Sequence, residues 1–285
     1  MLINLDGKLL PADQPIFTAD NRSFRYGDGL FETIRVFDGA MPFLPRHWHR
    51  LMLGFDKLKF EKPEDFTQQF IQDQINRLTN GKGNWRIRLT VWRAGGGHYT
   101  PDSDQFHYVI TASELESAHF ELNKTGLVVG IVQNFRLPLP TTKPSILLPF
   151  KTNSSLVYVL ASLFKQENNL DDCLLLNTGE RLACGSSSNV YLVKDNELFT
   201  PPTPEGCLKG TMRGAVLAAA KRLNLKVHTI PVTLDLMKEA DEVLLTNAIQ
   251  GIRWVWQVEG YPNHYGYSCA MDLVDELNKI VGESQ

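Results

Sequence analysis

The sequence is poor in cysteine, and its cysteines follow no pattern. Cys173, Cys184, Cys207 and Cys269 lack CxxC spacing, which argues against both a disulfide framework and a zinc site. We therefore expect a reducing compartment, namely the cytoplasm, and we predict no metal site.

Long apolar runs are also missing. No uninterrupted apolar stretch approaches the roughly 18 to 20 residues that a membrane-spanning helix needs. The N-terminus, MLINLDGKLL, carries an acidic residue at Asp6 and lacks the basic region and following apolar region of a signal peptide. These absences predict a soluble protein that has no membrane partner.

Positive charge is not in excess either. Lys and Arg number 29 against 32 Asp and Glu, so the net charge of -3 provides no basic field of the kind that holds nucleic acid. Hydrophobic residues make up 43% and charged residues 21% of the 285 positions, which excludes disordered, collagen-like and coiled-coil classes. At roughly 150 residues per domain, this length favours two compact domains.

The first half of the chain mixes strand and helix patterns. Short apolar runs are punctuated by turn signals at Asp6-Gly7 and Asp38-Gly39, and later residues recur at helical spacing up to a stop at Asn80-Gly81. The glycine-rich stretch RAGGGHY then separates two alternating segments. The predicted elements are strands and hairpins over 2–36, helices over 48–58 and 66–78, and strands over 85–91 and 106–112.

A polar stretch with little periodicity, between about Glu114 and Thr125, marks the predicted domain boundary. We place an N-terminal α+β domain at 1–118 and a C-terminal domain at 119–285. The C-terminal domain is predicted to contain strands at LVVGIV, CLLL, VYLV, LFT, VLLT and IRWVWQV, and helices begun by Asn153 or Ser154, over 211–223 and near the C-terminus.

Lys151 is a candidate nucleophile. It follows the apolar run ILLPF and precedes the helix predicted to begin at Asn153 or Ser154. Partial burial and the positive end of a helix dipole both disfavour the ammonium form, which favours a nucleophilic amine able to form a Schiff base. A solvated surface lysine is the alternative.

Several features suit an anion or a polar ligand. Gly210 precedes a helix that begins near Thr211, where backbone N–H groups would suit a phosphate, although an ordinary capped helix fits as well. Arg50 falls off the apolar stripe of its helix beside His47 and Gly54, and a guanidinium clamps phosphate well; a solvated arginine is the alternative. The run 185–189, GSSSN, and the loop RAGGGHY offer further polar groups but also suit structural turns.

Read together and in order, these motifs resemble the class IV family of pyridoxal-phosphate enzymes. The motifs are NRSFRYGDGLFET, HWHRL, Lys151 before its helix, GSSSNVYLV, LKGTMR and DEVLLTNA. The family includes D-amino-acid aminotransferases, branched-chain aminotransferases and 4-amino-4-deoxychorismate lyases. The resemblance implies a two-domain α+β protein of fold type IV, with a smaller N-terminal domain, a larger barrel-like C-terminal domain that binds pyridoxal 5'-phosphate between the two, and a homodimeric assembly.

The resemblance also implies roles for individual residues. Lys151 matches the lysine that holds the cofactor as an internal aldimine and later moves the proton at the substrate's α-carbon. The other positions expected to contact the cofactor are Arg50, which matches the phosphate-binding arginine, Cys184, Ser187, Leu208 against the cofactor ring, Gly210, Thr211, Met212 and Asn247. The positions expected on the substrate side are Tyr26, Phe31, His98, Tyr99 and Asn247.

Cys184 departs from the family pattern. Relatives usually carry a glutamate here, facing the pyridine nitrogen of the cofactor, whereas this chain reads Leu182-Ala183-Cys184-Gly185. A thiol of ordinary pKa, about 8.5, is a poorer anionic partner, so we expect the cofactor ring to withdraw electrons less strongly. A small buried packing residue is the alternative reading of Cys184.

Three activities remain open. RAGGGHY and Thr246-Asn247-Ala248 resemble features of 4-amino-4-deoxychorismate lyase, which eliminates pyruvate and leaves 4-aminobenzoate, although His98 stands where these lyases usually have an arginine. A transaminase for branched-chain or D-amino acids fits the motif order equally well. The third reading is a protein that binds pyridoxal phosphate but catalyses poorly because of Cys184.

Overall fold

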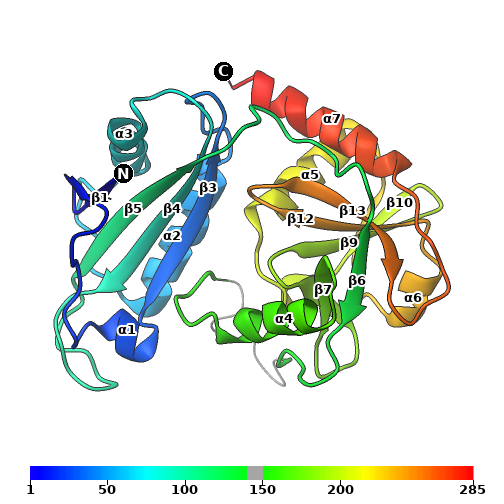
Figure 1. The fold of residues 1–285 in the computed structure, drawn as a ribbon, viewed down its shortest axis with the longest axis horizontal. Coiled ribbons are helices and arrows are strands. Elements are labelled where there is room, and N and C mark those ends of the chain that lie inside the picture. The colour runs from blue at the N-terminus through cyan, green and yellow to red at the C-terminus, as the bar shows by residue number, and fades with distance from the viewer. Residues whose placement is uncertain (140–149, 285) are drawn as a thin grey trace. The chain divides into compact units, whose positions relative to one another are not determined.

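The computed structural model describes residues 1–139 and 150–284, which fall into two compact units (Figure 1). Unit 1 comprises Met1–His119 together with Phe150–Ser155 and Ser284. Unit 2 comprises 120–139 and Leu156–Glu283. The short segment around Lys151 therefore packs with unit 1, although it follows the first strand of unit 2 in the sequence.

Unit 1 is built on an antiparallel five-stranded sheet with the order β2-β1-β5-β4-β3. Its strands are β1 (Leu2–Leu5), β2 (Lys8–Pro11), β3 (Gly29–Val36), β4 (Trp85–Arg93) and β5 (Phe106–Glu114). Its helices are α1 (Arg22–Tyr26), α2 (Leu44–Leu58) and α3 (Gln68–Thr79). The sequence-based prediction of strands and hairpins over 2–36 missed α1, whose first turn is capped by the Asn21 side chain.

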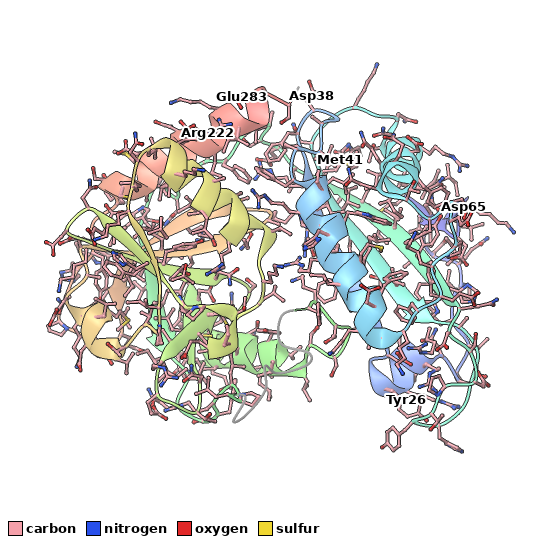
Figure 2. All side chains as sticks on the ribbon, turned by 180° about the vertical axis from the view of Figure 1, so that it is seen from behind. Tyr26, Asp38, Met41, Asp65, Arg222 and Glu283 are labelled. Carbon is pink, nitrogen blue, oxygen red and sulfur yellow. The ribbon has the colours of Figure 1, made fainter. Side chains whose placement is uncertain are left out.

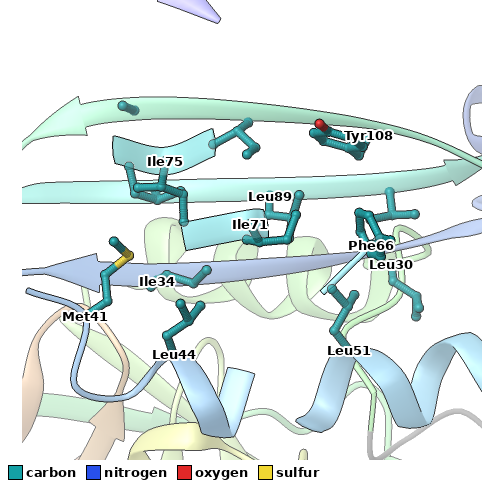
Figure 3. Close-up of a cluster of buried hydrophobic side chains, with 14 of the residues drawn as sticks. Leu30, Ile34, Met41, Leu44, Leu51, Phe66, Ile71, Ile75, Leu89 and Tyr108 are labelled. Atoms are coloured by element: carbon teal, nitrogen blue, oxygen red, sulfur yellow. The ribbon is translucent and has the colours of Figure 1, made fainter. Parts of the chain in front are cut away.

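The alternation along β3 explains the two faces of this sheet. Leu30 and Ile34 are buried in the core with residues of α2 and α3, whereas Phe31 belongs to the opposite face. The core contains Leu51 of α2, Ile71 and Ile75 of α3, Leu89 of β4 and Tyr108 of β5 (Figure 3). Both predicted helices are confirmed, and Asn80 ends α3 in the left-handed conformation with a φ of 56°.

Unit 2 is built on an eight-stranded mixed sheet with the order β11-β10-β9-β12-β13-β6-β7-β8. The β13–β6, β6–β7 and β10–β11 pairs are parallel and the others antiparallel. Its strands are β6 (Leu127–Ile131), β7 (Asp172–Leu176), β8 (Leu182–Gly185), β9 (Asn189–Lys194), β10 (Glu197–Thr200), β11 (Val227–Thr229), β12 (Glu242–Asn247) and β13 (Gly251–Val258).

Helices pack around this second sheet. They are α4 (Leu156–Glu167), the 3-10 turn η1 (Thr203–Glu205), α5 (Thr211–Arg222), α6 (Leu234–Lys238) and α7 (Ser268–Gly282). Arg222 at the end of α5 donates two hydrogen bonds of 2.8 Å to Glu283 just after α7, so the ends of these helices are tied together (Figure 2). Met212, Val216 and Ala219 lie on the buried face of α5.

The helix that follows Lys151 begins later than predicted. It starts at Leu156, not at Asn153 or Ser154, because Thr152 forms a bridge with Leu30 and the Asn153 N–H donates to the Gly29 carbonyl at 2.9 Å. This pairing keeps the backbone extended. The part of the run ILLPF before Phe150 lies outside the described residues.

Residues 1–139 and 150–284 contain neither a candidate membrane-spanning helix nor a candidate metal-binding cluster. No helix there is both long and apolar enough to cross a membrane. Nor does this part of the chain gather three or more His, Cys, Asp or Glu side chains in a position to hold a metal ion.

Candidate active site

Lys151 lies against the free edge of the sheet in unit 1. Its carbonyl accepts a hydrogen bond of 2.8 Å from the Phe31 N–H on β3. Its amine lies over the Phe31 ring, with Nζ 4.6 Å from the ring centroid. The backbone of this residue is therefore fixed by strand pairing and its side chain by an aromatic contact.

A buried ionic cluster lies on the helix-covered face of β3. Glu32 accepts hydrogen bonds from Arg50 Nε at 2.8 Å and from Arg50 Nη2 at 2.6 Å. The His47 ring, one turn before Arg50 on α2, lies 2.7 Å from the same carboxylate. All three side chains are buried, so the sequence alternative of a solvated Arg50 is excluded. Sequence reasoning did not assign a role to Glu32, although it is the acidic residue of the motif LFET.

The charge states in this cluster follow from its contacts. Burial alone would raise the pKa of Glu32, but Arg50 and then His47 outweigh it and hold this pKa at about 2. Burial lowers the pKa of His47 despite the nearby carboxylate. Near neutral pH the cluster is therefore a Glu32–Arg50 ion pair with a neutral imidazole that donates from Nδ1.

Burial and neighbouring guanidinium groups lower the pKa of the Lys151 amine. Burial, followed by the positive charge of Arg50, lowers the pKa of Lys151 to about 8. Arg88 of β4 lies on the same Phe31 ring, with Cζ 3.9 Å from its centroid, and lowers this pKa further. Burial acts here as predicted from the sequence, whereas arginines supply the positive field that the sequence analysis assigned to a helix end. Such an amine is partly neutral near physiological pH and half neutral at about pH 8.

The loop RAGGGHY is held by one buried arginine. Arg22 of α1 donates to the carbonyls of Gly96 at 2.9 Å and Gly97 at 3.2 Å, and also to the His98 carbonyl at 2.5 Å. Its Nε donates to Asp28 at 2.8 Å. The predicted substrate-side residue Tyr99 is 88% exposed at the tip of this loop.

Tyr26 and Tyr99 are brought together, and Phe31 is placed elsewhere. The rings of Tyr26 and Tyr99 have centroids 5.4 Å apart, and the Arg22 guanidinium lies 5.2 Å from the Tyr26 centroid. Phe31 instead contacts Lys151 and Arg88. Unit 1 thus holds two groups of predicted substrate-side residues, one at the loop and one at the lysine.

In unit 2, Cys184 is buried in an apolar cluster. It pairs with Leu175 across β8 and β7, and its neighbours in the cluster include Cys173, Cys207 and Tyr158. Burial raises the pKa of Cys184 well above the ordinary thiol value, and Cys207 and Asp172 raise it further. The side chain is therefore a neutral thiol at any physiological pH.

The N-terminus of α5 presents backbone donors. The first hydrogen bond within the helix runs from the Gly214 N–H to the Gly210 carbonyl at 3.2 Å, so the N–H groups of Thr211 and Met212 precede it. The residue at the N-cap position is Gly210, which has no side chain to cap this end. Both residues are buried, and Leu208 is half-buried just before them.

Gly210 is required by the close approach of Asn189. A Cβ atom at Gly210 would lie 1.9 Å from Asn189 Oδ1, and Asn189 Nδ2 donates to the Leu208 carbonyl at 2.9 Å. Asn189 thereby fixes the turn that leads into α5. The sequence signal for it was the last residue of the run GSSSN, which had been read only as polar anchoring.

Two hydroxyl groups near this turn lack a partner among the described residues. Thr246 Oγ1 and Ser188 Oγ are buried without a hydrogen bond there. Thr246 of β12 stands opposite Asn189 of β9, so it belongs to the same corner as the α5 N-terminus. Both residues lie in motifs named from the sequence, GSSSN and Thr246-Asn247-Ala248, but neither was among those expected to contact the cofactor. Buried hydroxyls of this kind suit an oxygen-rich ligand such as a phosphate.

Two predicted cofactor residues have other surroundings. Ser187 is exposed. Asn247 is half-buried and engaged in its own turn, where Oδ1 accepts from the Gln250 N–H at 2.9 Å and Nδ2 donates to Gln250 Oε1 at 2.9 Å. A ligand contact from Asn247 therefore has to compete with this turn.

A family model described as amino-transferase class IV matches residues 29–258. The chain belongs to this family. Class IV enzymes depend on pyridoxal phosphate. The fold is accordingly fold type IV, a two-sheet α+β structure with a curled sheet in the C-terminal part.

Individual relatives of this class IV chain divide among three activities. D-alanine aminotransferase of Staphylococcus aureus is 23% identical over 271 residues, covering 93% of this chain and 91% of the relative. A branched-chain aminotransferase structure from Thermoproteus uzoniensis has a TM-score of 0.86 at 21% identity and covers 100% and 96% of the two chains. A 4-amino-4-deoxychorismate lyase structure from Pseudomonas aeruginosa has a TM-score of 0.81 at 27% identity and covers 98% of both.

Proposed function

We propose that this class IV chain binds pyridoxal 5'-phosphate through the amine of Lys151. The placement of Lys151 carries the proposal: its backbone is pinned to β3, and burial with Arg50 lowers the pKa of its amine to about 8. An amine that is partly neutral near physiological pH attacks an aldehyde readily.

The residues of unit 2 fit the phosphate of this cofactor. The Thr211 and Met212 N–H groups are features of a phosphate site, as are the hydroxyls of Thr246 and Ser188, which have no hydrogen-bond partner among the described residues. The family resemblance assigns the cationic contact with the phosphate to Arg50. Leu208 would pack against the ring, and Cys184 would meet its nitrogen as a neutral thiol.

When bound, the cofactor withdraws electrons from the carbon that carries the substrate amine. Lys151 Nζ would be the base that takes the proton from that carbon. In an elimination, Lys151 then returns a proton to the departing enolpyruvyl group, which leaves as pyruvate. Arg50, paired with Glu32, would hold the phosphate during these steps.

The specific reaction we propose is that of a 4-amino-4-deoxychorismate lyase. Such a substrate is acidic, and Arg88 lies beside Lys151 on the Phe31 ring, where it can pair with a substrate carboxylate. Because the product is aromatic, its formation helps to drive the elimination, and the weaker electron withdrawal expected beside a neutral Cys184 is tolerable. The loop RAGGGHY and the Thr246-Asn247-Ala248 turn also resemble those of the lyases.

Two alternatives have specific support. An amino acid transaminase, for branched-chain or D-amino acids, is favoured by the relatives with those activities. A protein that binds the cofactor but turns over slowly is favoured by the neutral Cys184.

We also propose that the protein is a homodimer. Light scattering of the purified protein would test this.

The deciding experiment has two stages. Pyridoxal phosphate is added to the purified protein, the visible spectrum is recorded, and borohydride reduction is followed by peptide mapping. We expect a new absorption band and the label on Lys151; label on another lysine, or no band, would contradict the proposal. Aminodeoxychorismate is then compared with a panel of amino acids and keto acids. Formation of 4-aminobenzoate and pyruvate without a keto acid identifies the lyase, whereas a requirement for a keto acid identifies the transaminase.

A further inference from the structure

The Gly27-Asp28-Gly29 motif has no role in the proposed chemistry, yet both glycines face the segment after Lys151. Gly27 ends α1 with a φ of +67°, and a Cβ there would lie 2.9 Å from the Ser154 Cβ and 3.0 Å from its backbone nitrogen. A Cβ at Gly29 would lie 2.3 Å from Asn153 Nδ2. The two glycines thus leave the space that Asn153 and Ser154 occupy.

Asn153 ties this segment to three elements of unit 1. Its backbone N–H donates to the Gly29 carbonyl of β3 at 2.9 Å. Its side-chain Nδ2 donates to Ser23 Oγ of α1 at 2.8 Å and to the Val91 carbonyl of β4 at 3.2 Å. Together with the Phe31 N–H bond to the Lys151 carbonyl, these contacts hold three consecutive residues, 151–153, at the edge of β3.

We propose that Gly27, Gly29 and Asn153 are positioning residues that dock the Lys151 segment on β3 and so fix where its amine lies. The importance of this docking rests on the proposed function, in which Lys151 is the reactive amine. The docking itself requires no cofactor. It also gives the Gly-Asp-Gly motif a physical purpose, since any larger side chain at either glycine would push the segment away.

The environment of the amine depends on this docking. The charged and titratable groups that affect it come from α2, β3 and β4: they are Arg50, His47, Glu32, Arg86 and Arg88. Among these described groups, the three arginines favour the neutral amine, as burial does, and Glu32 favours the ammonium. A segment released from β3 would move Nζ into water, and its pKa would return toward the ordinary lysine value near 10.4.

The test measures the reactivity of Lys151 in the cofactor-free protein. Trace acetic anhydride labels the protein between pH 6 and 11, and mass spectrometry compares the Lys151 peptide with that of exposed Lys124. We expect the labelling of wild-type Lys151 to show a midpoint near pH 8. In Asn153→Ala and in Gly27→Ala, the midpoint should rise by about one unit or more as the amine becomes solvated.

Gly81→Ala provides the matched control. Gly81 has a φ of +65°, close to that of Gly27, but a Cβ there would meet nothing within 4 Å. Both substitutions carry the same backbone strain, and only Gly27→Ala also displaces Ser154. If Gly27→Ala fails to fold, Asn153→Ala and Ser23→Ala report on the same docking, and Ser23→Ala is expected to give a smaller shift in the same direction.

An unchanged Lys151 midpoint in folded Asn153→Ala and Ser23→Ala would overturn the inference, as would an ordinary lysine midpoint in the wild type. A failure of the proposed function looks different. In that case wild-type Lys151 titrates near pH 8 and responds to Asn153→Ala, but pyridoxal phosphate does not attach to it.

Discussion

The carboxylate of Glu32 accepts both hydrogen bonds from one edge of the Arg50 guanidinium, at 2.8 and 2.6 Å, in the buried interior of unit 1. This pairing joins β3, whose edge carries Lys151, to α2. It fixes the guanidinium in one orientation, since a bidentate carboxylate leaves little rotational freedom. The residue proposed to bind phosphate is thus oriented before any ligand arrives.

Removing one member of this pair should cost more stability than removing both. Arg50→Met leaves Glu32 buried without its guanidinium, and we expect a loss of about 3 to 5 kcal/mol in the free energy of unfolding. The double variant Glu32→Met with Arg50→Met removes both charges and should lose clearly less. Urea unfolding of the cofactor-free proteins measures both values. Equal losses of unfolding free energy in the single and the double variant would contradict an energetic coupling between Glu32 and Arg50.

The same carboxylate predicts a loss of stability in acid. The folded-state pKa of Glu32 is about 2, below its ordinary value of 4.5, so its contribution is present above pH 4.5 and disappears as the pH falls toward 2. The size of this contribution is on the order of 3 kcal/mol. His47, whose pKa is lowered by burial, begins the decline as the pH falls below about 6.5, because the unfolded imidazole then binds a proton.

Unfolding free energies measured between pH 7 and pH 3 check this expectation. Glu32→Gln should be less stable than the wild type at pH 7 and should show a shallower decline below pH 4.5. The exposed Glu64→Gln provides the control for a lost surface carboxylate and should follow the wild-type curve. Parallel curves for wild type and Glu32→Gln would contradict the assignment.

The sequence predicted the local features of this site better than the long-range ones. Arg50 was noticed because it falls off the apolar stripe of its helix, yet α2 buries it beside His47, where it pairs with Glu32. The helix after Lys151 was predicted to start too early because its true start depends on pairing with Gly29 and Leu30, which are far away in the sequence. No local pattern encodes such an edge contact.

The partners of the buried charges could not be predicted from the sequence either. Glu32 stands at a position where strand alternation predicts a core residue, and nothing nearby in the sequence shows that Arg50 and His47 would neutralise it. Likewise, the role of Gly210 became clear only when β9 brought Asn189 against it. Residue types suggested the chemistry, whereas the contacts that tune it required the fold.

Arg88 should lower the pKa of the Lys151 amine. Its positive charge lies on the same Phe31 ring as Lys151 and lowers the pKa of the amine, so Arg88→Met should raise that pKa by roughly half a unit. The pKa of the Lys151 amine is measured from the rate of pyridoxal phosphate attachment as a function of pH, which should have a midpoint near pH 8 in the wild type. Arg46→Met, on the exposed side of α2, serves as the control and should leave the midpoint unchanged. A lower midpoint in Arg88→Met would refute the electrostatic argument.

Gly210 should control phosphate affinity. A Cβ at this position would lie 1.9 Å from Asn189 Oδ1, so Gly210→Ala must displace Asn189 and the turn that presents the Thr211 and Met212 N–H groups. We expect affinity for pyridoxal phosphate to fall at least about tenfold, while affinity for pyridoxal, which has no phosphate, changes little. Gly282→Ala, where a Cβ meets nothing within 4 Å, should match the wild type for both ligands. Equal losses for the two ligands would place the effect outside the phosphate site.

Cys184→Glu tests the departure from the family pattern. The thiol is neutral because burial raises its pKa well above the ordinary value, and a glutamate in the same apolar cluster would carry a costly charge. We therefore expect the cofactor-free variant to lose roughly 2 to 4 kcal/mol in the free energy of unfolding. With cofactor, a carboxylate facing the ring nitrogen should keep that nitrogen protonated and increase transamination of amino acids. Elimination driven by an aromatic product depends less on a protonated ring nitrogen, so production of 4-aminobenzoate should persist.

Cys184→Gln, similar in size and uncharged, separates the effect of the charge from the steric effect. It should share part of the stability loss and show no gain in transamination. Loss of elimination in Cys184→Glu but not in Cys184→Gln would mean that the neutral thiol is itself required for the lyase reaction, and not merely tolerated by it.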